Sequence, residues 1–349
     1  MELTEAMPTC WLQNGSTLVR VPPGPKVASE RGEIGIASSH GAVKLPFAGA
    51  DSNPGVKRMR DFENDQRSLS PKPKVDRREM LTASLAAGFA AAVRPASGQT
   101  AIHTNAEGLT AGDVRIPTSD REIPAYRAMP AGAGPYPVIL VVQEIFGVHE
   151  HIRDVCRRLA KLGYMAIAPE LYVRQGSVAD LADIQKIIST IVSKVPDAQV
   201  MSDLDATVAW AEKSGNGDIT RLGITGFCWG GRITWLYAAH SGKLKAGVAW
   251  YGRLVGDSTS NTPRHPVDVA EELKAPVLGL YAGQDTGIPP DTVERMRAAC
   301  AAAKKECEIV VYPDAPHAFN ADYRPSYRPE DANDAWQKML AWFRQHGVS

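Results

Sequence analysis

One short stretch constrains the fold of this chain more than any other. A β-branched run leads into a Gly-x-Cys-x-Gly motif at 226–230, and a helical pattern follows over 232–239. This order predicts a strand, a sharp turn and a helix, with Cys228 at the tip of the turn. A residue at such a tip has a strained backbone and needs small neighbours two positions away on each side, which Gly226 and Gly230 supply. The stretch favours an accessible nucleophile; the alternative is a buried core thiol, which is common for free cysteine.

Strand and helix patterns alternate from residue 136 onward, after an expected edge hairpin at 114–127. The other expected strands are 136–142, 164–168, 246–251, 276–282 and 308–312, and the other expected helices are 150–162, 179–193, 199–213, 291–303 and 331–346. This alternation predicts one α/β domain over 101–349, with a mainly parallel, doubly wound sheet flanked by helices. In such folds the active groups lie on loops beyond the carboxyl ends of the strands.

Composition excludes several classes of function. Lysine plus arginine and aspartate plus glutamate both number 39, so no net charge favours nucleic acid or an anionic membrane surface. The five cysteines are too few and too scattered for a disulfide framework, and none has zinc-ligand spacing. We therefore expect no cofactor and no metal, a small-molecule substrate, no nucleic-acid partner, no stable membrane insertion, and a monomer or small homo-oligomer.

The first hundred residues differ in character from the rest of the chain. Residues 1–75 are rich in Gly, Pro, Ser and charge, which predicts a disordered extension. Within 76–100, a paired arginine, an apolar run at 80–93 and a small-residue exit resemble a twin-arginine export signal, and the run is too short to span a bilayer of about 30 Å. Since such signals begin near the start of a protein, we expect translation to begin at Met59. The expected location is the periplasm; the alternative is an alanine-rich surface helix in a cytoplasmic protein.

Two residues follow strand ends where an acid and a base are needed. Asp285 lies in a turn after the strand at 276–282, and His317 follows the strand at 308–312. The order along the chain is then nucleophile, acid and histidine, as in α/β-hydrolases. Taken singly, each could be an ordinary loop residue. The other histidines, including those at 149, 151 and 240, lack this placement and are expected to be structural.

The combined motifs resemble one family. The elbow at 226–231, the Gln-Glu-Ile-Phe-Gly segment at 143–147, the Pro-Glu-Leu-Tyr segment at 169–172, and the later Asp285 and His317 are similar to the dienelactone hydrolase (carboxymethylenebutenolidase) family. The resemblance covers roughly residues 110–345 and implies an α/β-hydrolase fold.

The resemblance also implies the catalytic roles. Cys228 matches the nucleophile, Asp285 the acid and His317 the base. Glu144 matches a carboxylate that interacts with the resting cysteine and helps to form the thiolate when substrate binds. The same expectation follows physically, because a carboxylate beside a thiol opposes its ionisation; the alternative is a solvated loop glutamate.

Further positions match the substrate-binding parts of the family site. Backbone amides of Ile145 and Trp229 are expected to form the oxyanion hole. Arg174 matches an arginine that binds the substrate carboxylate, with a solvated surface arginine as the alternative. Phe146 and Tyr172 are expected to line the pocket, or else to belong to the core.

Two segments depart from the compact family pattern. The loop at 253–275 is longer, and a Tyr-Arg pair at 323–324 follows the histidine, so Arg324 is also expected to contact substrate. We therefore predict a hydrolase that opens a small carboxylate-bearing enol-lactone or ester through an acyl-enzyme on Cys228. The alternatives are a broader carboxylesterase or thioesterase, and an exported non-catalytic ligand-binding or redox-sensing protein.

Overall fold

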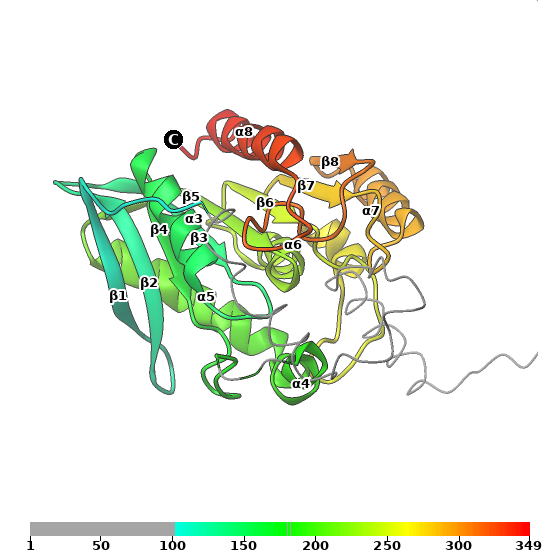
Figure 1. The fold of residues 1–349 in the computed structure, drawn as a ribbon, viewed down its shortest axis with the longest axis horizontal. Helices are drawn as coiled ribbons and strands as arrows, with labels where there is room; N and C mark the ends of the chain where they lie inside the picture. Colours follow the sequence, from blue (N-terminus) through cyan, green and yellow to red (C-terminus); the bar gives the residue numbers. More distant parts are fainter. Residues whose placement is uncertain (1–101, 180, 182) are drawn as a thin grey trace, which may run out of the picture. The chain divides into compact units, whose positions relative to one another are not determined.

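The computed structural model describes residues 102–179, 181 and 183–349. The extension over 1–75 and the export signal over 76–100 lie outside the described residues. One eight-stranded sheet has the order β1-β2-β4-β3-β5-β6-β7-β8 (Figure 1). The strands are β1 (Leu109–Pro117), β2 (Glu122–Pro130), β3 (Tyr136–Val142), β4 (Met165–Pro169), β5 (Gly217–Phe227), β6 (Ala246–Trp250), β7 (Val277–Ala282) and β8 (Cys307–Tyr312).

The sheet is mostly parallel, as predicted. Strands β3 to β8 pair only in parallel with one another, whereas β1 and β2 form an antiparallel hairpin that joins β4 in antiparallel register. The parallel strands are buried apolar runs, which is typical of strands covered on both faces. The expected edge hairpin and the α/β-hydrolase type of sheet are both confirmed.

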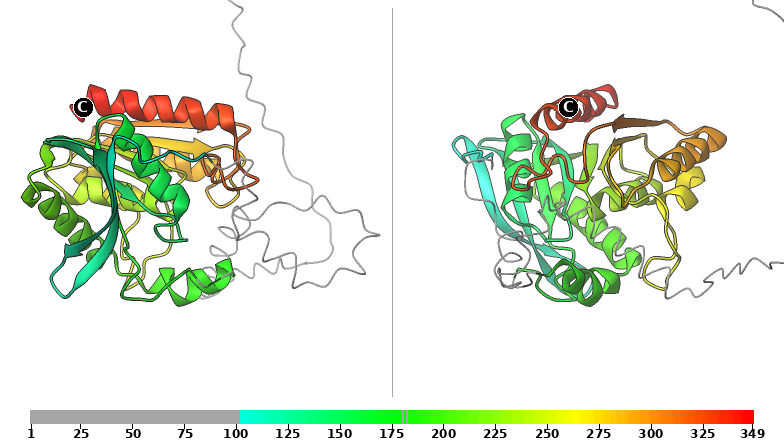
Figure 2. Two further views of the ribbon diagram at one scale, coloured as in Figure 1. Left: turned by 60° about the vertical axis from the view of Figure 1, so that its left-hand side comes forward. Right: turned by 45° about the vertical axis from the view of Figure 1, so that its right-hand side comes forward.

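Helices cover both faces of the sheet (Figures 1 and 2). They are α3 (Glu150–Lys161), α4 (Ile184–Thr190), α5 (Asp197–Lys213), α6 (Trp229–His240), α7 (Pro290–Ala303) and α8 (Pro329–Gln345), with short 3₁₀ helices η1 (Val192–Lys194) and η2 (Pro266–Glu272). In the sheet, β4 lies on one side of β3 and β5 lies on the other, so the connection from β3 to β4 runs across the sheet in the opposite direction to the later connections. Because such connections are right-handed, α3 lies on the face opposite α5, α6 and α7. The α8 helix packs on the face opposite α6: a Cβ built on Gly223 meets Phe343, and one built on Gly226 meets Thr234.

Two predicted segments differ from the structure. The helix expected over 179–193 is shorter, because the Asp183 side chain accepts a hydrogen bond from the Lys186 amide and starts α4 there, and the chain tightens into η1 after Ile191. The long loop expected over 253–275 contains η2, at whose start the His265 amide donates a hydrogen bond to Asp268 Oδ2 at 2.8 Å. The loop is therefore an ordered wall beside the carboxyl end of the sheet.

Within the described residues, one disulfide joins two cysteines whose spacing in the sequence predicts no disulfide framework. Cys300 in the last turn of α7 is bonded to Cys307 at the start of β8, with their Cα atoms 6.2 Å apart. The connecting turn brings the end of the helix beside the start of the next strand, and the separation in sequence is only seven residues. Among the described cysteines, Cys156 and Cys228 remain free.

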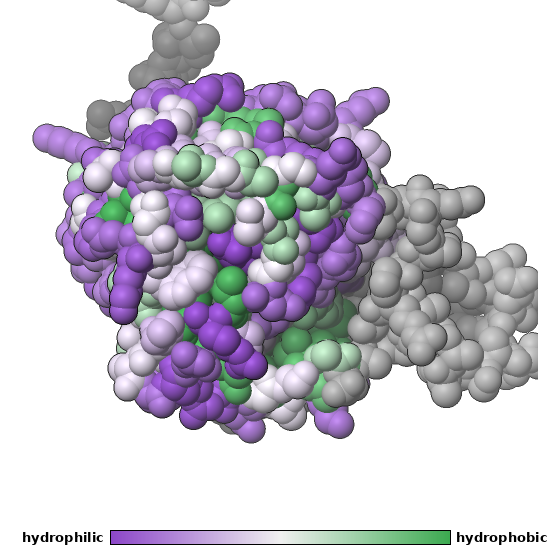
Figure 3. Space-filling model, turned by 90° about the vertical axis from the view of Figure 1, so that its left-hand side faces the viewer, coloured by the Kyte–Doolittle hydropathy of each residue, from purple (hydrophilic) through white to green (hydrophobic). Residues whose placement is uncertain are grey.

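The molecular face toward the β1 edge is mainly hydrophilic, with separate smaller hydrophobic areas (Figure 3). No helix within the described ranges is long and apolar enough to cross a membrane.

Candidate active site

The carboxyl ends of neighbouring parallel strands bring five chemically active residues to one edge of the sheet. The strands β3, β5, β6, β7 and β8 are consecutive in the sheet (Figure 1). Glu144, Cys228, Tyr251, Asp285 and His317 each follow the end of one of them. This is the edge at which doubly wound sheets carry their sites.

Cys228 occupies the strained turn predicted for it. It lies between β5 and α6 with φ 55° and ψ −113°, in the left-handed region that non-glycine residues rarely adopt. A Cβ on Gly226 would lie 2.2 Å from the Gly230 carbonyl oxygen, and one on Gly230 would lie 2.5 Å from the Val142 carbonyl oxygen. Both glycines are therefore required by close backbone approach, and the tight turn holds a partly exposed sulfur at its tip.

Asp285 and His317 form a buried pair. The distance from His317 Nδ1 to Asp285 Oδ2 is 2.5 Å, and the other carboxylate oxygen accepts hydrogen bonds from the amides of Gly287 and Ile288 at 2.9 and 3.2 Å. Burial opposes protonation of the ring, but the Asp285 carboxylate and the neighbouring Cys228 side chain outweigh it and hold the pKa of His317 well above its ordinary value. The ring is therefore held in one orientation and readily carries a proton.

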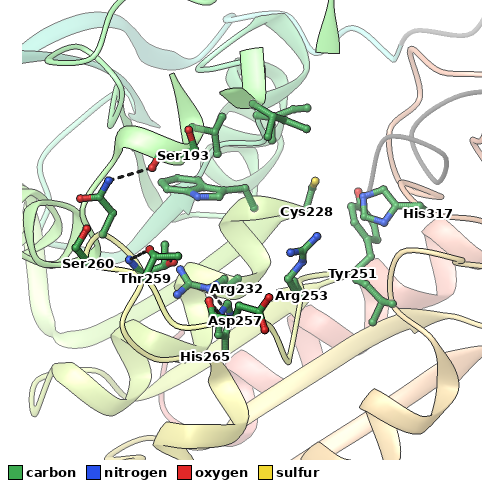
Figure 4. Close-up of a pocket in the computed structure, with 17 residues that line it drawn as sticks. Ser193, Cys228, Arg232, Tyr251, Arg253, Asp257, Thr259, Ser260, His265 and His317 are labelled. Carbon is green, nitrogen blue, oxygen red and sulfur yellow. Dashed lines mark hydrogen bonds between the residues drawn. The ribbon is translucent and has the colours of Figure 1, made fainter. Parts of the chain in front are cut away.

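Cys228 and His317 open into the same cavity, which has a volume of about 390 Å³ (Figure 4). His317 Nε2 is buried and has no hydrogen-bond partner among the described residues, so it is available to a thiol or a substrate atom. Figure 4 shows Cys228, His317 and Tyr251 at one end of the cavity, with Ser193, Thr259 and Ser260 at the other. The cavity thus has a reactive end and a hydroxyl-bearing end.

Two backbone amides near the Cys228 sulfur are candidates to donate hydrogen bonds to an anion. Trp229 is the first residue of α6, where the N–H groups lack partners within the helix, and Ile145 lies in the loop after β3. Neither amide donates a hydrogen bond to another residue in the part of the chain that is described. Both residues line the cavity that holds Cys228, as an oxyanion hole requires.

Glu144 is buried, and its hydrogen-bond partners lie on other elements than Cys228. Its Oε2 accepts a hydrogen bond from the Tyr323 hydroxyl at 2.6 Å and lies 3.2 Å from His149 Nε2. No hydrogen bond joins it to Cys228 within the described residues. Burial raises the pKa of Glu144, but His149, the nearby His151 and Tyr323 outweigh that effect and lower it to about 2. The carboxylate is ionised, and its hydrogen-bond partners are Tyr323 and His149 rather than the expected Cys228.

Phe146, Tyr172 and Arg324 lie along a second cavity of about 750 Å³ rather than along the one that holds Cys228. The Arg324 guanidinium lies 5.5 Å from the centre of the Phe146 ring. The Tyr172 ring contacts Trp229 at a centroid distance of 4.9 Å. Since Trp229 lines the first cavity and Tyr172 the second, their contact lies between the two cavities. Phe146, Tyr172 and Arg324 thus line a different cavity from Cys228.

Arg174 is not at the site. Its guanidinium donates to Asp203 Oδ2 at 2.6 Å, to Asp120 Oδ1 at 2.6 Å and to the Thr118 hydroxyl at 3.0 Å. It lines neither cavity. The predicted role in binding a substrate carboxylate is therefore corrected: Arg174 ties the β1–β2 turn to α5, because these two carboxylates occupy its donors.

Sequence reasoning missed several residues of the Cys228 cavity. Tyr251, with φ 37°, follows β6 and packs edge-on against His317 at a centroid distance of 5.1 Å. Other cavity residues are Arg232, Arg253, Asp257, His265 and the polar set Ser193, Thr259, Ser260, Asn261 and Thr262. The position of Tyr251 and Arg253 just past a parallel strand was the available signal. Within the described ranges no group of three or more His, Cys, Asp or Glu residues is arranged to hold a metal ion.

Comparison with known proteins agrees with this geometry. The Dienelactone hydrolase family matches residues 123–347. The chain belongs to the dienelactone hydrolase family. A protein of Methylorubrum extorquens named "Putative carboxymethylenebutenolidase" is 66% identical over 291 residues, which cover 83% of this chain and all of that protein. An Escherichia coli protein of the same name is 59% identical over 261 residues, or 74% of this chain and 96% of that one.

A solved structure of a dienelactone hydrolase relative gives the same fold. The Klebsiella pneumoniae protein named "Putative Dienelactone Hydrolase" is 62% identical, covers 68% of this chain and 99% of its own, and superposes with a TM-score of 0.67. Membership of the dienelactone hydrolase family identifies the chain as an enzyme, a hydrolase with the α/β-hydrolase fold.

Proposed function

We propose that this dienelactone hydrolase relative opens a small carboxylate-bearing enol-lactone or ester by means of a Cys228–His317–Asp285 triad. One observation supports the proposal above the others. A cysteine at a strained turn opens into the same cavity as a histidine whose second ring nitrogen is held by a buried aspartate. A protein that only binds a ligand has no need of a base oriented in this way.

The proposed reaction has two halves. His317 Nε2 takes the proton of the Cys228 thiol, and the sulfur attacks the substrate carbonyl. The amides of Ile145 and Trp229 stabilise the oxyanion of the tetrahedral intermediate. When the intermediate collapses, the C–O bond of the ester or lactone breaks and His317 returns the proton to the departing oxygen. In a lactone this opens the ring and leaves the whole substrate attached as a thioester.

The second half releases the product. His317 takes a proton from water, the hydroxide attacks the thioester, and the sulfur leaves as a thiolate beside the protonated ring. The raised pKa of His317 supports this assignment, since a ring stabilised in its protonated form can coexist with the leaving thiolate.

We also propose export through the twin-arginine route. The signal itself lies outside the described residues, but the Cys300–Cys307 disulfide is typical of an oxidising compartment. Export of a folded chain is compatible with a free Cys228. Sequencing the N-terminus of protein recovered from the periplasmic fraction tests the proposal, and an unprocessed cytoplasmic chain beginning upstream of Met59 contradicts both the route and the start site.

The activity is tested by following dienelactone hydrolysis in the ultraviolet with the full chain and with Cys228→Ala. We expect turnover by the wild type and a loss of more than about 10⁴-fold in the variant, as for removal of other nucleophiles. Cleavage of a simple aryl ester without lactone turnover moves the assignment to a broader carboxylesterase. Ligand binding by a folded wild type without either hydrolysis supports a non-catalytic protein instead.

A further inference from the structure

We infer that the Tyr251 hydroxyl donates a hydrogen bond to the oxygen that leaves when the ester or lactone bond of the substrate breaks. The inference rests on the proposed hydrolysis at Cys228 and adds a catalytic residue to the acylation half of that reaction. Tyr251 lines the cavity that holds Cys228 and His317, and it is buried from solvent.

The backbone of Tyr251 is held by the same strands that hold the nucleophile. The Cys228 amide donates a hydrogen bond to the carbonyl oxygen of Trp250 at 3.0 Å, and the Tyr251 amide donates to the carbonyl oxygen of Leu280 in β7 at 2.8 Å. Tyr251 has φ 37°, in the left-handed region that a bulky residue rarely adopts. Such strained residues persist only where the surrounding structure holds them, and they cluster at functional sites. The position of Tyr251 relative to Cys228 is therefore fixed.

The aromatic ring of Tyr251 lies beside the proposed base. It packs edge-on against His317 at a centroid distance of 5.1 Å and against Phe319 at 5.4 Å. Figure 4 shows the Tyr251 side chain next to the His317 ring, on the side where Cys228 lies. Because His317 returns its proton to the departing oxygen, that oxygen must lie close to the His317 ring. The same place adjoins the Tyr251 side chain.

The Tyr251 hydroxyl has a hydrogen bond to give. Its oxygen is buried and has no hydrogen-bond partner among the residues that the structure describes. A buried polar group without a partner costs free energy, so a substrate oxygen in the cavity is a favourable acceptor. Burial and the nearby Glu144, Tyr323 and Cys228 raise the pKa of Tyr251 well above its ordinary value. The hydroxyl therefore keeps its proton and acts as a donor.

The departing oxygen is the substrate atom that lacks a second donor. The carbonyl oxygen already has the amides of Ile145 and Trp229, and the other hydroxyls labelled in Figure 4 lie at the far end of the cavity. When the C–O bond breaks, its electron pair passes to the departing oxygen, which becomes an alkoxide or, in an enol-lactone, an enolate. His317 gives this oxygen a proton. Tyr251 stabilises its developing charge through a hydrogen bond and transfers no proton.

The test compares the 4-nitrophenyl and trifluoroethyl monoesters of succinic acid, which form the same acyl-enzyme. Nitrophenolate leaves readily as an anion, whereas the more basic trifluoroethoxide needs a donor. We expect Tyr251→Phe to lower kcat/KM for the trifluoroethyl ester by about 10–100-fold, because a hydrogen bond to a developing charge is lost. The loss on the nitrophenyl ester should be less than about threefold, because little help is needed there. Since kcat/KM reports the steps up to acylation, the shared second half does not affect the comparison.

Two further measurements separate this role from a structural one. Tyr251→Phe keeps the ring and removes a hydroxyl that has no partner among the described residues, so its melting temperature should be no lower than that of the wild type. The matched control is Tyr237→Phe, which removes a buried hydroxyl near the other end of α6 that donates to Asp205 at 3.0 Å. Tyr237 does not line the cavity, so the ratio of kcat/KM between the two esters should not change.

The outcomes distinguish the inference from the proposed function. Equal losses on the two esters in Tyr251→Phe, or no loss on either, overturn the inference while hydrolysis at Cys228 stands. A change of the ratio in Tyr237→Phe as large as that in Tyr251→Phe overturns it too. Cleavage of neither ester by the wild type, or cleavage that survives Cys228→Ala, overturns the proposed function and this inference with it.

Discussion

Within the described residues, two buried histidine–aspartate pairs have nearly identical local geometry. His317 Nδ1 lies 2.5 Å from Asp285, and His151 Nδ1 lies 2.9 Å from Asp322. All four side chains are buried. In both pairs Nε2 is buried without a hydrogen-bond partner among the described residues. Judged by the pair alone, either could be the base and acid of a triad.

The surroundings of the two aspartates differ. The second oxygen of Asp285 accepts from the uncharged backbone amides of Gly287 and Ile288, so the charge of the carboxylate acts on His317. The second oxygen of Asp322 accepts from the Arg158 guanidinium at 2.7 Å. Burial raises the pKa of Asp322, but His151 and Arg158 outweigh burial and lower it.

The two histidines also face different neighbours. His317 shares its cavity with Cys228, whereas the His151 ring packs against Phe227, His149 and Tyr323. A buried His–Asp pair becomes a base only when a nucleophile adjoins its free nitrogen. His151 and Asp322 line the second cavity, whose lining does not include Cys228. The pair at His151 instead joins α3 to the segment after His317, beside the cluster of Glu144, His149 and Tyr323.

The largest expected effect separates the two pairs directly. His317→Gln should lower kcat by about 10³-fold or more, because general acid–base catalysis is lost. His151→Gln should leave kcat/KM within about threefold and lower the free energy of unfolding by about 1–3 kcal/mol, because a buried hydrogen bond is lost. Ester hydrolysis and denaturant unfolding of both variants measure the contrast.

The distinction between the two pairs is wrong if the two variants have the same activity and stability. A fall of 10³-fold in His151→Gln with unchanged stability would give the second pair a part in catalysis. Near-normal turnover in a folded His317→Gln would remove the proposed base.

The next prediction tests whether the buried, ionised carboxylate of Glu144 stabilises the folded protein. Its folded pKa of about 2 lies below its ordinary 4.5, so its contribution is complete above pH 4.5 and is lost as the pH falls toward 2. The wild type should lose about 3 kcal/mol more than Glu144→Gln across that window. Unfolding free energies measured from pH 6 to pH 2.5 give the difference. Parallel curves for the two proteins would show that Glu144 is not held as an ion.

The smallest effect concerns the hydroxyl that holds Glu144. Tyr323→Phe removes a 2.6 Å hydrogen bond to the buried carboxylate and should cost about 1.5–3 kcal/mol of unfolding free energy. The matched control is Tyr327→Phe, whose hydroxyl makes no hydrogen bond to another described residue and whose loss should cost less than about 0.5 kcal/mol. Equal melting temperatures for the two variants would remove Tyr323 from the support of Glu144.

Much of the fold and the order of the triad were predictable because they depend on short-range patterns. The glycine spacing around Cys228 determines the turn. A Cβ atom added at Gly226 or Gly230 would lie 2.2 or 2.5 Å from a backbone oxygen, so only glycine fits at either position. Buried apolar runs predicted the parallel strands, and parallel strands bring their carboxyl ends to one edge whatever the loops contain. Asp285 and His317 could be paired from this rule alone.

The choice of partner for each long or charged side chain depended on tertiary structure. Arg174 binds residues 54 and 29 positions away, and Glu144 binds Tyr323 across 179 positions. No local pattern encodes such a choice, because a flexible charged group takes whichever opposite charge or donor the packed elements bring within about 3 Å. The sequence by itself thus determined the sheet, the turn and the order in which Cys228, Asp285 and His317 follow the strand ends. Packing alone decided that Glu144 is bonded to Tyr323 and that Arg174 lines neither cavity.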